Sequence, residues 1–151
     1  MLPEQITADV IEPRVNKTER IRTDRTKTFA EVFTPSWICN RMLNHADAVW
    51  FGRRNVFNEE RDGSWTPNGD RITFPDGKTW MDYVSSRRLE ITCGESPFIT
   101  SRNDASTGVI IPVRNRIGIL DRKLRVVGEN TDSEEEWFTW TVKAFQSVYG
   151  Y

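Results

Sequence analysis

The chain has 151 residues, of which 37% are hydrophobic and 28% charged, and its formal net charge is −1. This length suits one domain with a hydrophobic core, and the near-neutral charge gives no overall field that would draw in nucleic acid or an anionic membrane. Two cysteines without metal-ligand spacing and a single histidine give no support for a disulfide framework or a metal site. No apolar run approaches the ~18 residues of a membrane span and no secretory leader opens the sequence, so we expect a cytoplasmic protein that contacts no membrane.

The first 28 residues are predicted to form a basic arm in front of a folded domain that covers residues 29–151. Six basic side chains lie between Arg14 and Lys27, against Glu19 and Asp24. Because these charges are mixed and form no helical stripe, a solvated leader is favoured over an arm that contacts DNA phosphates.

A helix is predicted over residues 35–50. Thr34 suits the N-cap position, and Pro35 suits the first helical position, where its missing N–H costs nothing. Ile38 and Met42 begin an apolar side at helical spacing.

Two shorter elements are predicted before the centre of the chain. Ile72 and Phe74 are expected in a short strand, and Trp80 to Arg88 in a short helix that leads into Leu89.

The central stretch, Leu89 to Ile99, is predicted to form a strand, a turn and the start of a helix. A glycine at the turn, Gly94, lets a ligand approach the main chain closely. Glu90 and Glu95 suit hydroxyl and amine donors, and both would oppose a pyrophosphate.

A second strand is expected at Arg116 to Leu120, followed directly by Asp121. Strands that alternate with helices favour a parallel α/β sheet, where ligands bind at the carboxyl ends of strands. An acid at such an end suits the ribose hydroxyls of a nucleoside-type ligand. The alternative, in which Asp121 only caps a loop, has equal weight at this point.

The last helix is predicted to begin at Ser133 and to run to the end of the chain. Ser133 with Glu136 fits a capping box. Its core side is expected to be a wide apolar stripe, which predicts burial on more than one side. The stripe is centred on Phe138, Val142, Phe145 and Tyr149.

These segments together resemble the S-adenosylmethionine-dependent DNA adenine methyltransferases of restriction–modification systems. The first motif of that family is similar to Glu90-Ile91-Thr92-Cys93-Gly94-Glu95-Ser96-Pro97-Phe98, and its Phe/Tyr-Thr-Pro motif is similar to Val32-Phe33-Thr34-Pro35. The blocks Arg116 to Val127 and Trp137 to Tyr151 also look like one branch of the family, so the resemblance covers about residues 28–151. It implies a partial Rossmann-like methyltransferase fold, an α/β fold with an incomplete parallel sheet and flanking helices.

The resemblance implies a cofactor site for S-adenosylmethionine. The Phe-Thr-Pro segment would line the pocket, the central stretch would hold the methionine portion, and Asp121 would bind the ribose. The implied cofactor-binding residues are Phe33, Thr34, Pro35, Glu90, Thr92, Cys93, Gly94, Glu95, Pro97, Phe98 and Asp121. The chain departs from the commoner motif where Ser96-Pro97 replaces a second glycine, and its insertion between the two motifs is long.

The catalytic motif of the family, Asn/Asp-Pro-Pro-Tyr/Phe, is missing, because no Pro-Pro occurs in this chain. We therefore expect a truncated or split methyltransferase portion that holds the cofactor, has no catalytic residue and is inactive alone. A C-terminal methyltransferase chain would supply the catalytic loop and contact the DNA.

The alternative function is that of a non-catalytic interaction protein, for instance a phage-borne one. Such a protein would dock on a host restriction–modification subunit or on nucleic acid and interfere with it. The exposed edge of an incomplete sheet would favour pairing with another chain or self-association.

Overall fold

A computed structural model describes residues 34–88 and 98–149 of the chain. These residues form four α-helices, one short 3-10 helix and two strands. The elements are α2 (Ser36–Phe51), β1 (Asn58–Arg61), β2 (Ser64–Pro67), α3 (Trp80–Ser85), η3 (Val113–Asn115), α4 (Ile119–Asn130) and α5 (Glu134–Tyr149). The predicted arm, residues 1–28, lies outside the described residues, as does the predicted turn from Leu89 to Pro97.

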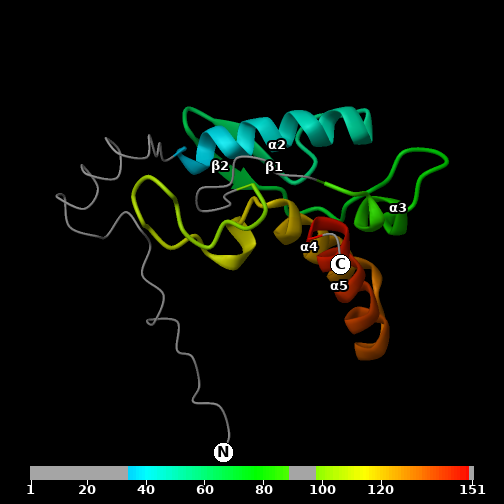
Figure 1. The fold of residues 1–151 in the computed structure, drawn as a ribbon. Coiled ribbons are helices and arrows are strands. Elements are labelled where there is room, and N and C mark those ends of the chain that lie inside the picture. Colours follow the sequence, from blue (N-terminus) through cyan, green and yellow to red (C-terminus); the bar gives the residue numbers. More distant parts are fainter. Residues whose placement is uncertain (1–33, 89–97, 150–151) are drawn as a thin grey trace, which may run out of the picture.

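Helix α2 and the α4–α5 pair lie on opposite sides of the β1–β2 hairpin, with α3 beside α4 and α5 (Figure 1). The core fills the space between them. It combines aromatic rings from the end of α2 and the hairpin with aliphatic side chains of α4, and Tyr83 of α3 contacts both Phe51 and Phe57 at ring-centroid distances of 5.1 and 5.6 Å.

The predicted helix over residues 35–50 is confirmed, although its beginning differs in detail. The helix starts at Ser36, so that Pro35 takes the N-cap position in place of Thr34 and no side chain of its own segment caps it. The backbone N–H of Ser36 instead donates to the carboxylate of Asp104, at 2.9 Å. The helix ends at Gly52, whose φ of 70° is a left-handed conformation that favours glycine.

The mixed α/β class is confirmed, but the sheet within the described residues is a two-stranded antiparallel hairpin and not a parallel sheet. The expected strand at Ile72 and Phe74 is absent there. The expected strand at Arg116 to Leu120 was also wrong, because this stretch follows η3 and turns into α4 at Ile119. Leu120, Leu124 and Val127 recur at helical spacing, and that longer periodicity outweighs the short alternation of Ile117 and Ile119.

The predicted helices over residues 80–88 and from Ser133 onwards are confirmed as elements, but the helix expected to start at the end of the central stretch is wrong, because no helix begins at Phe98 or Ile99. Helix α3 is shorter than expected and has a full capping box between Thr79 and Asp82. At the beginning of α5, the Ser133 hydroxyl accepts from the N–H of Glu136 at 3.2 Å, as predicted, whereas the Glu136 carboxylate accepts from Asp132 and not from Ser133.

The predicted burial of α5 on more than one side was wrong. Only Ala144 and Val148 of this helix are buried among the described residues, and Phe138 of the predicted core side is 64% exposed. Val142, Phe145 and Tyr149 are exposed as well. The small side chain of Ala144 faces the core and lets α4 approach closely, so the wide aromatic stripe is left on the outside.

A buried ion pair joins the two sides of the fold. Arg122 of α4 is 2% exposed and donates from Nη1 to the Asp47 carboxylate of α2. Its Nη2 donates to Asn40 and Asn44 at 2.8 and 3.0 Å, and its Nε donates to the backbone oxygen of Ile117 at 2.8 Å. Every nitrogen of the guanidinium therefore has a partner, as a buried arginine requires.

The opposite oxygen of Asp47 accepts from the buried hydroxyl of Tyr83, at 3.1 Å. Burial, reinforced by the nearby Asp47 carboxylate, raises the pKa of Tyr83 well above its usual value. Lys123 is also buried, and its Nζ donates to the backbone oxygen of Ser86 and to the Ser147 hydroxyl, which ties α4 to both neighbouring helices. Burial lowers the pKa of Lys123 to about 8.

Replacing Arg122 with Met is expected to lower the free energy of unfolding by about 3–5 kcal/mol, because the substitution leaves the Asp47 carboxylate buried without its cation. Urea unfolding monitored by circular dichroism measures this loss. The matched control is Arg41→Met, which removes the exposed ion pair between Arg41 and Glu60 and is expected to cost less than about 1 kcal/mol. Equal losses in the two variants would contradict the importance assigned to the buried pair.

Candidate functional site

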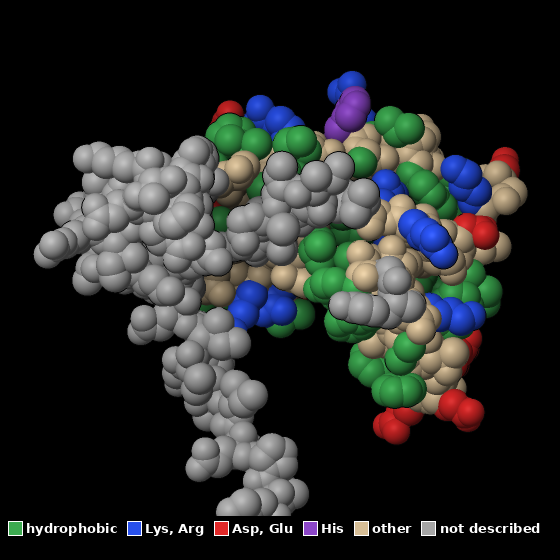
Figure 2. Space-filling model, in the orientation of Figure 1, with side chains coloured by type: hydrophobic (Ala, Val, Ile, Leu, Met, Phe, Trp, Pro, Cys, Tyr) green, Lys and Arg blue, Asp and Glu red, His purple; other side chains and the backbone are tan. Residues whose placement is uncertain are grey.

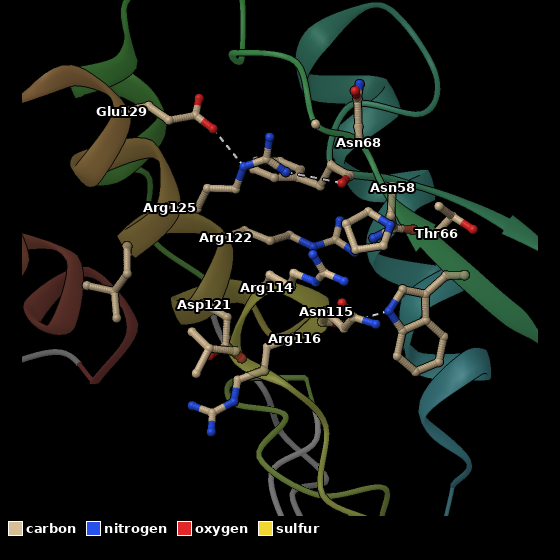
Figure 3. Close-up of a pocket in the computed structure, with 16 residues that line it drawn as sticks. Asn58, Thr66, Asn68, Arg114, Asn115, Arg116, Asp121, Arg122, Arg125 and Glu129 are labelled. Atoms are coloured by element: carbon tan, nitrogen blue, oxygen red, sulfur yellow. Dashed lines mark hydrogen bonds and ion pairs between the residues drawn. The ribbon is translucent and has the colours of Figure 1, made fainter.

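A cleft of about 900 Å³ lies between the β1–β2 hairpin, η3 and α4 (Figure 3). Hydrogen bonds hold its walls together at two places. The indole N–H of Trp65 in β2 donates to the backbone oxygen of Asn115 at 2.7 Å, which fixes η3 against the hairpin. On the other side, Arg125 of α4 donates to the backbone oxygens of Phe57 and Asp70 at 3.3 and 2.9 Å. Hydrogen bonds between these elements therefore hold the walls of the cleft in place.

Cationic side chains outnumber acidic ones around this cleft. Four arginines line it, namely Arg114, Arg116, Arg122 and Arg125, against two acids, Asp121 and Glu129. Arg122 is neutralised by Asp47, and Arg125 donates to Glu129 at 2.7 Å. Arg116 lies near the Asp121 carboxylate, so Arg114 supplies the excess positive charge.

Asp121 lies in the first turn of α4, and not at the end of a strand as predicted. Its Oδ2 accepts from the backbone N–H and the hydroxyl of Ser101, at 3.0 and 3.2 Å. Burial raises the pKa of this carboxyl, against the hydrogen bonds from Ser101 and the nearby guanidinium of Arg116. The residue thus holds a loop in place and also lines the cleft.

Phe98, the last residue of the predicted cofactor motif, lies beside the beginning of α4. Its backbone oxygen accepts from the N–H of Ile119 at 2.7 Å, and the next backbone oxygen, of Ile99, accepts from Leu120 at 3.0 Å. This close contact requires glycine at position 118, because a Cβ there would lie 2.4 Å from the Ile99 oxygen. The end of one predicted motif and Asp121 are thereby brought together.

Thr34 and Pro35 immediately precede α2. The hydrogen bond from Ser36 to Asp104 joins this segment to the loop that follows Phe98. The described part of the Phe-Thr-Pro motif is therefore connected to the region of Phe98 and Asp121 through that loop. The other predicted site residues lie outside the described residues, and the structure gives no position for them. They are Phe33, Glu90, Thr92, Cys93, Gly94, Glu95 and Pro97.

The sequence interpretation missed the arginines of the cleft. Arg114-Asn115-Arg116, which follows Pro112 and Val113, is the signal that could have found them, because arginine side chains suit the binding of phosphate and carboxylate groups. Their position opposite Trp65 depends on contacts between residues about 50 positions apart, which no local pattern reveals.

Comparisons with known proteins found no match: no family model, no curated protein and no solved structure resembles this chain. Within residues 34–88 and 98–149, no group of three or more histidine, cysteine and acidic side chains is placed to hold a metal ion. Among the same residues, no helix is both long and apolar enough to cross a membrane.

Asp104 organises the loop that follows Phe98. Its Oδ1 accepts from the backbone N–H groups of Ser106 and Thr107, at 3.0 and 2.8 Å, and its Oδ2 accepts from Ser36. Partial burial disfavours the charged form, but the hydrogen bonds from Ser106, Ser36 and Thr107 outweigh it and hold the pKa well below its usual value.

Asp104→Ala is expected to lower the free energy of unfolding at pH 7 by about 1–2 kcal/mol, as for loss of a helix N-cap. A carboxyl whose pKa is lower in the folded state stabilises the protein above its unfolded pKa, and this contribution disappears as the pH falls towards the folded value. The difference between the wild type and the variant should therefore be complete above about pH 5 and should shrink towards pH 2. Denaturant unfolding at a series of pH values measures it, and a difference independent of pH would contradict the assignment.

Proposed function

We propose that this chain is the S-adenosylmethionine-binding portion of a DNA adenine methyltransferase and that it transfers no methyl group by itself. The observation that supports the proposal is the hydrogen bonding of the Phe98–Ser101 segment to the beginning of α4. It places the end of one family-like motif against Asp121 of the next. The proposed cofactor site would include Asp121 and the residues that the resemblance assigns before Phe98.

The chemistry of the proposed residues suits the cofactor. Glu90 would attract the ammonium group, Gly94 would allow close approach to the main chain, and Asp121 would accept a ribose hydroxyl. Ser101 binds the Oδ2 oxygen of Asp121, so a hydroxyl would bind Oδ1. When bound, S-adenosylmethionine supplies an electrophilic methyl group on a sulfonium. S-adenosylmethionine has a net positive charge, and Arg114 and Arg116 have no assigned role in holding it.

The exposed face of α5 supports a partner chain. Phe138, Val142, Phe145 and Tyr149 are spaced by four, three and four residues, the spacing of a helix side that packs against another helix. Figure 2 shows hydrophobic side chains along this region, beside the acidic side chains at the beginning of α5. We propose that a C-terminal methyltransferase chain covers this face and provides both the catalytic Asn/Asp-Pro-Pro-Tyr/Phe motif and the contacts with DNA, in the cytoplasm.

The same exposed face also favours a second candidate, a non-catalytic interaction protein that docks on a host restriction–modification subunit. The two functions differ in whether the cofactor binds. A chain that captures such a subunit but gives no cofactor binding would support the second candidate, as would self-association through α5 without a methyltransferase partner.

Calorimetric titration with S-adenosylmethionine tests the first candidate. We expect weak binding by the wild type, loss of detectable binding in Glu90→Ala, and roughly tenfold weaker binding in Asp121→Asn because a charged hydrogen-bond acceptor is lost. Glu59→Ala is the control, since Glu59 is an exposed acid of β1 outside the cleft. Absence of heat with the wild type would contradict the cofactor assignment, and methylation of adenine in DNA by the chain alone would contradict the need for a partner.

A further inference from the structure

We propose that the cleft between the hairpin, η3 and α4 binds a nucleoside phosphate, whose phosphate group is held by Arg114. The inference does not rest on the proposed cofactor function, because Arg114 has no role in that function. Three observations support it: the hydrogen-bonding groups of the cleft that have no partner, the excess of positive over negative side chains that line it, and the ring of Trp65 in its wall.

The unused hydrogen-bonding groups are mainly donors. Within the described part of the chain, Arg114 is exposed and has neither a hydrogen bond nor an ion pair. Arg116 donates from its Nε to the backbone oxygen of Ile111 at 3.4 Å, which leaves its two terminal nitrogens without a partner there. The side-chain amide of Asn115, between them, is also unpaired among these residues. Three consecutive residues therefore present free donors at one edge of the cleft.

The acceptors of the cleft are largely occupied. Glu129 accepts from Arg125 with one oxygen and from the backbone N–H of Ile72 with the other, at 2.7 and 2.8 Å. Asp121 accepts from Ser101 with Oδ2, which leaves its Oδ1 as an acceptor. A ligand that completes this site must bring acceptors and negative charge, and arginine forks match the oxygens of phosphate particularly well.

Figure 3 shows how the arginines of the cleft are oriented. Arg114 points towards the middle of the cleft, near Arg122, whereas the side chain of Arg116 extends away from both of them. Four of the five N–H groups of Arg122 are bound by α2 and the Ile117 backbone, so this residue mainly adds rigidity. Arg114 is therefore the residue on which an anion in the cleft would depend most.

The apolar part of the wall suits a flat ring system. Trp65 lines the cleft with its indole N–H already bound to Asn115, so the ring can offer only its apolar surface to a ligand. Leu124 of α4 adds an aliphatic surface to the same cleft. Aromatic faces stack on nucleobases without regard to base identity, and a volume of about 900 Å³ accommodates a nucleotide.

Two sources provide this chemistry: a free nucleotide and a nucleotide unit within a nucleic acid strand. Fluorescence anisotropy with a labelled single-stranded oligonucleotide, together with calorimetry of AMP and ATP, distinguishes them. We expect binding of at least one probe, and oligonucleotide affinity should fall steeply with added salt because phosphate contacts release counterions. Inorganic phosphate alone should bind more weakly than AMP, because it lacks the ring that Trp65 would contact.

Arg114→Glu is the decisive variant. Because Arg114 makes no hydrogen bond or ion pair within the described structure, the variant should unfold at nearly the same temperature as the wild type, while its affinity for the bound probe should fall at least tenfold. Arg54→Glu makes the same charge change at an exposed position outside the cleft, and we expect less than a twofold change.

Two results would overturn the proposal. One is the absence of binding of the oligonucleotide and of both nucleotides at millimolar concentration. The other is an equal loss of affinity in Arg114→Glu and Arg54→Glu, which would indicate a general effect of net charge. Failure of S-adenosylmethionine to bind would leave this inference untouched, because no residue tested here belongs to the proposed cofactor set.

Discussion

The ion pair between Arg122 and Asp47 is the contact on which the arrangement of this fold depends. Removing both charges from water costs several kcal/mol per ion, and the structure offsets that cost by giving every guanidinium nitrogen a partner. The pair fixes the rotation of α4 about its axis, since one face of the helix must point at α2. Asp121 and Arg125, next to that face on the same helix, are therefore presented to the cleft in a defined orientation.

The distribution of charge explains how a nearly neutral chain can carry a cationic site. Its formal net charge of −1 sums over regions of opposite sign. Three consecutive glutamates lie at the beginning of α5, where the positive end of the helix dipole stabilises their charge. The arginines lie around the cleft. Fields from such regions act over about 8–10 Å at physiological salt, so a ligand at the cleft meets the arginines and not the total charge.

Helices α2, α3 and α5 could be predicted from the sequence because their signals are local, whereas α4 was not predicted. A proline at the start of α2 and Ser133 at the start of α5 mark beginnings that the structure contains within a residue or two. The strand expected before Asp121 was wrong because the five residues from Arg116 to Leu120 fit both the periodicity of a strand and that of a helix. Only the apolar positions that continue to Val127 distinguish the two. The burial of Arg122 and the exposure of Phe138 contradict the usual preference of each residue type, and both depend on what the rest of the chain places opposite them.

The sequence separations of these contacts also bear on the order in which the structure forms. Helices α4 and α5 are neighbours in the chain and can pair early, whereas Arg122 meets Asp47 across 75 residues. Closing so long a loop has a large entropic cost before any contact compensates for it, so docking of α2 is expected late in folding. The last element to dock is commonly the first to open, and α2 carries the segment that begins with Thr34 and Pro35. Transient release of this helix would then expose the core from the side opposite α5, and it would free Asp104 and its loop at the same moment.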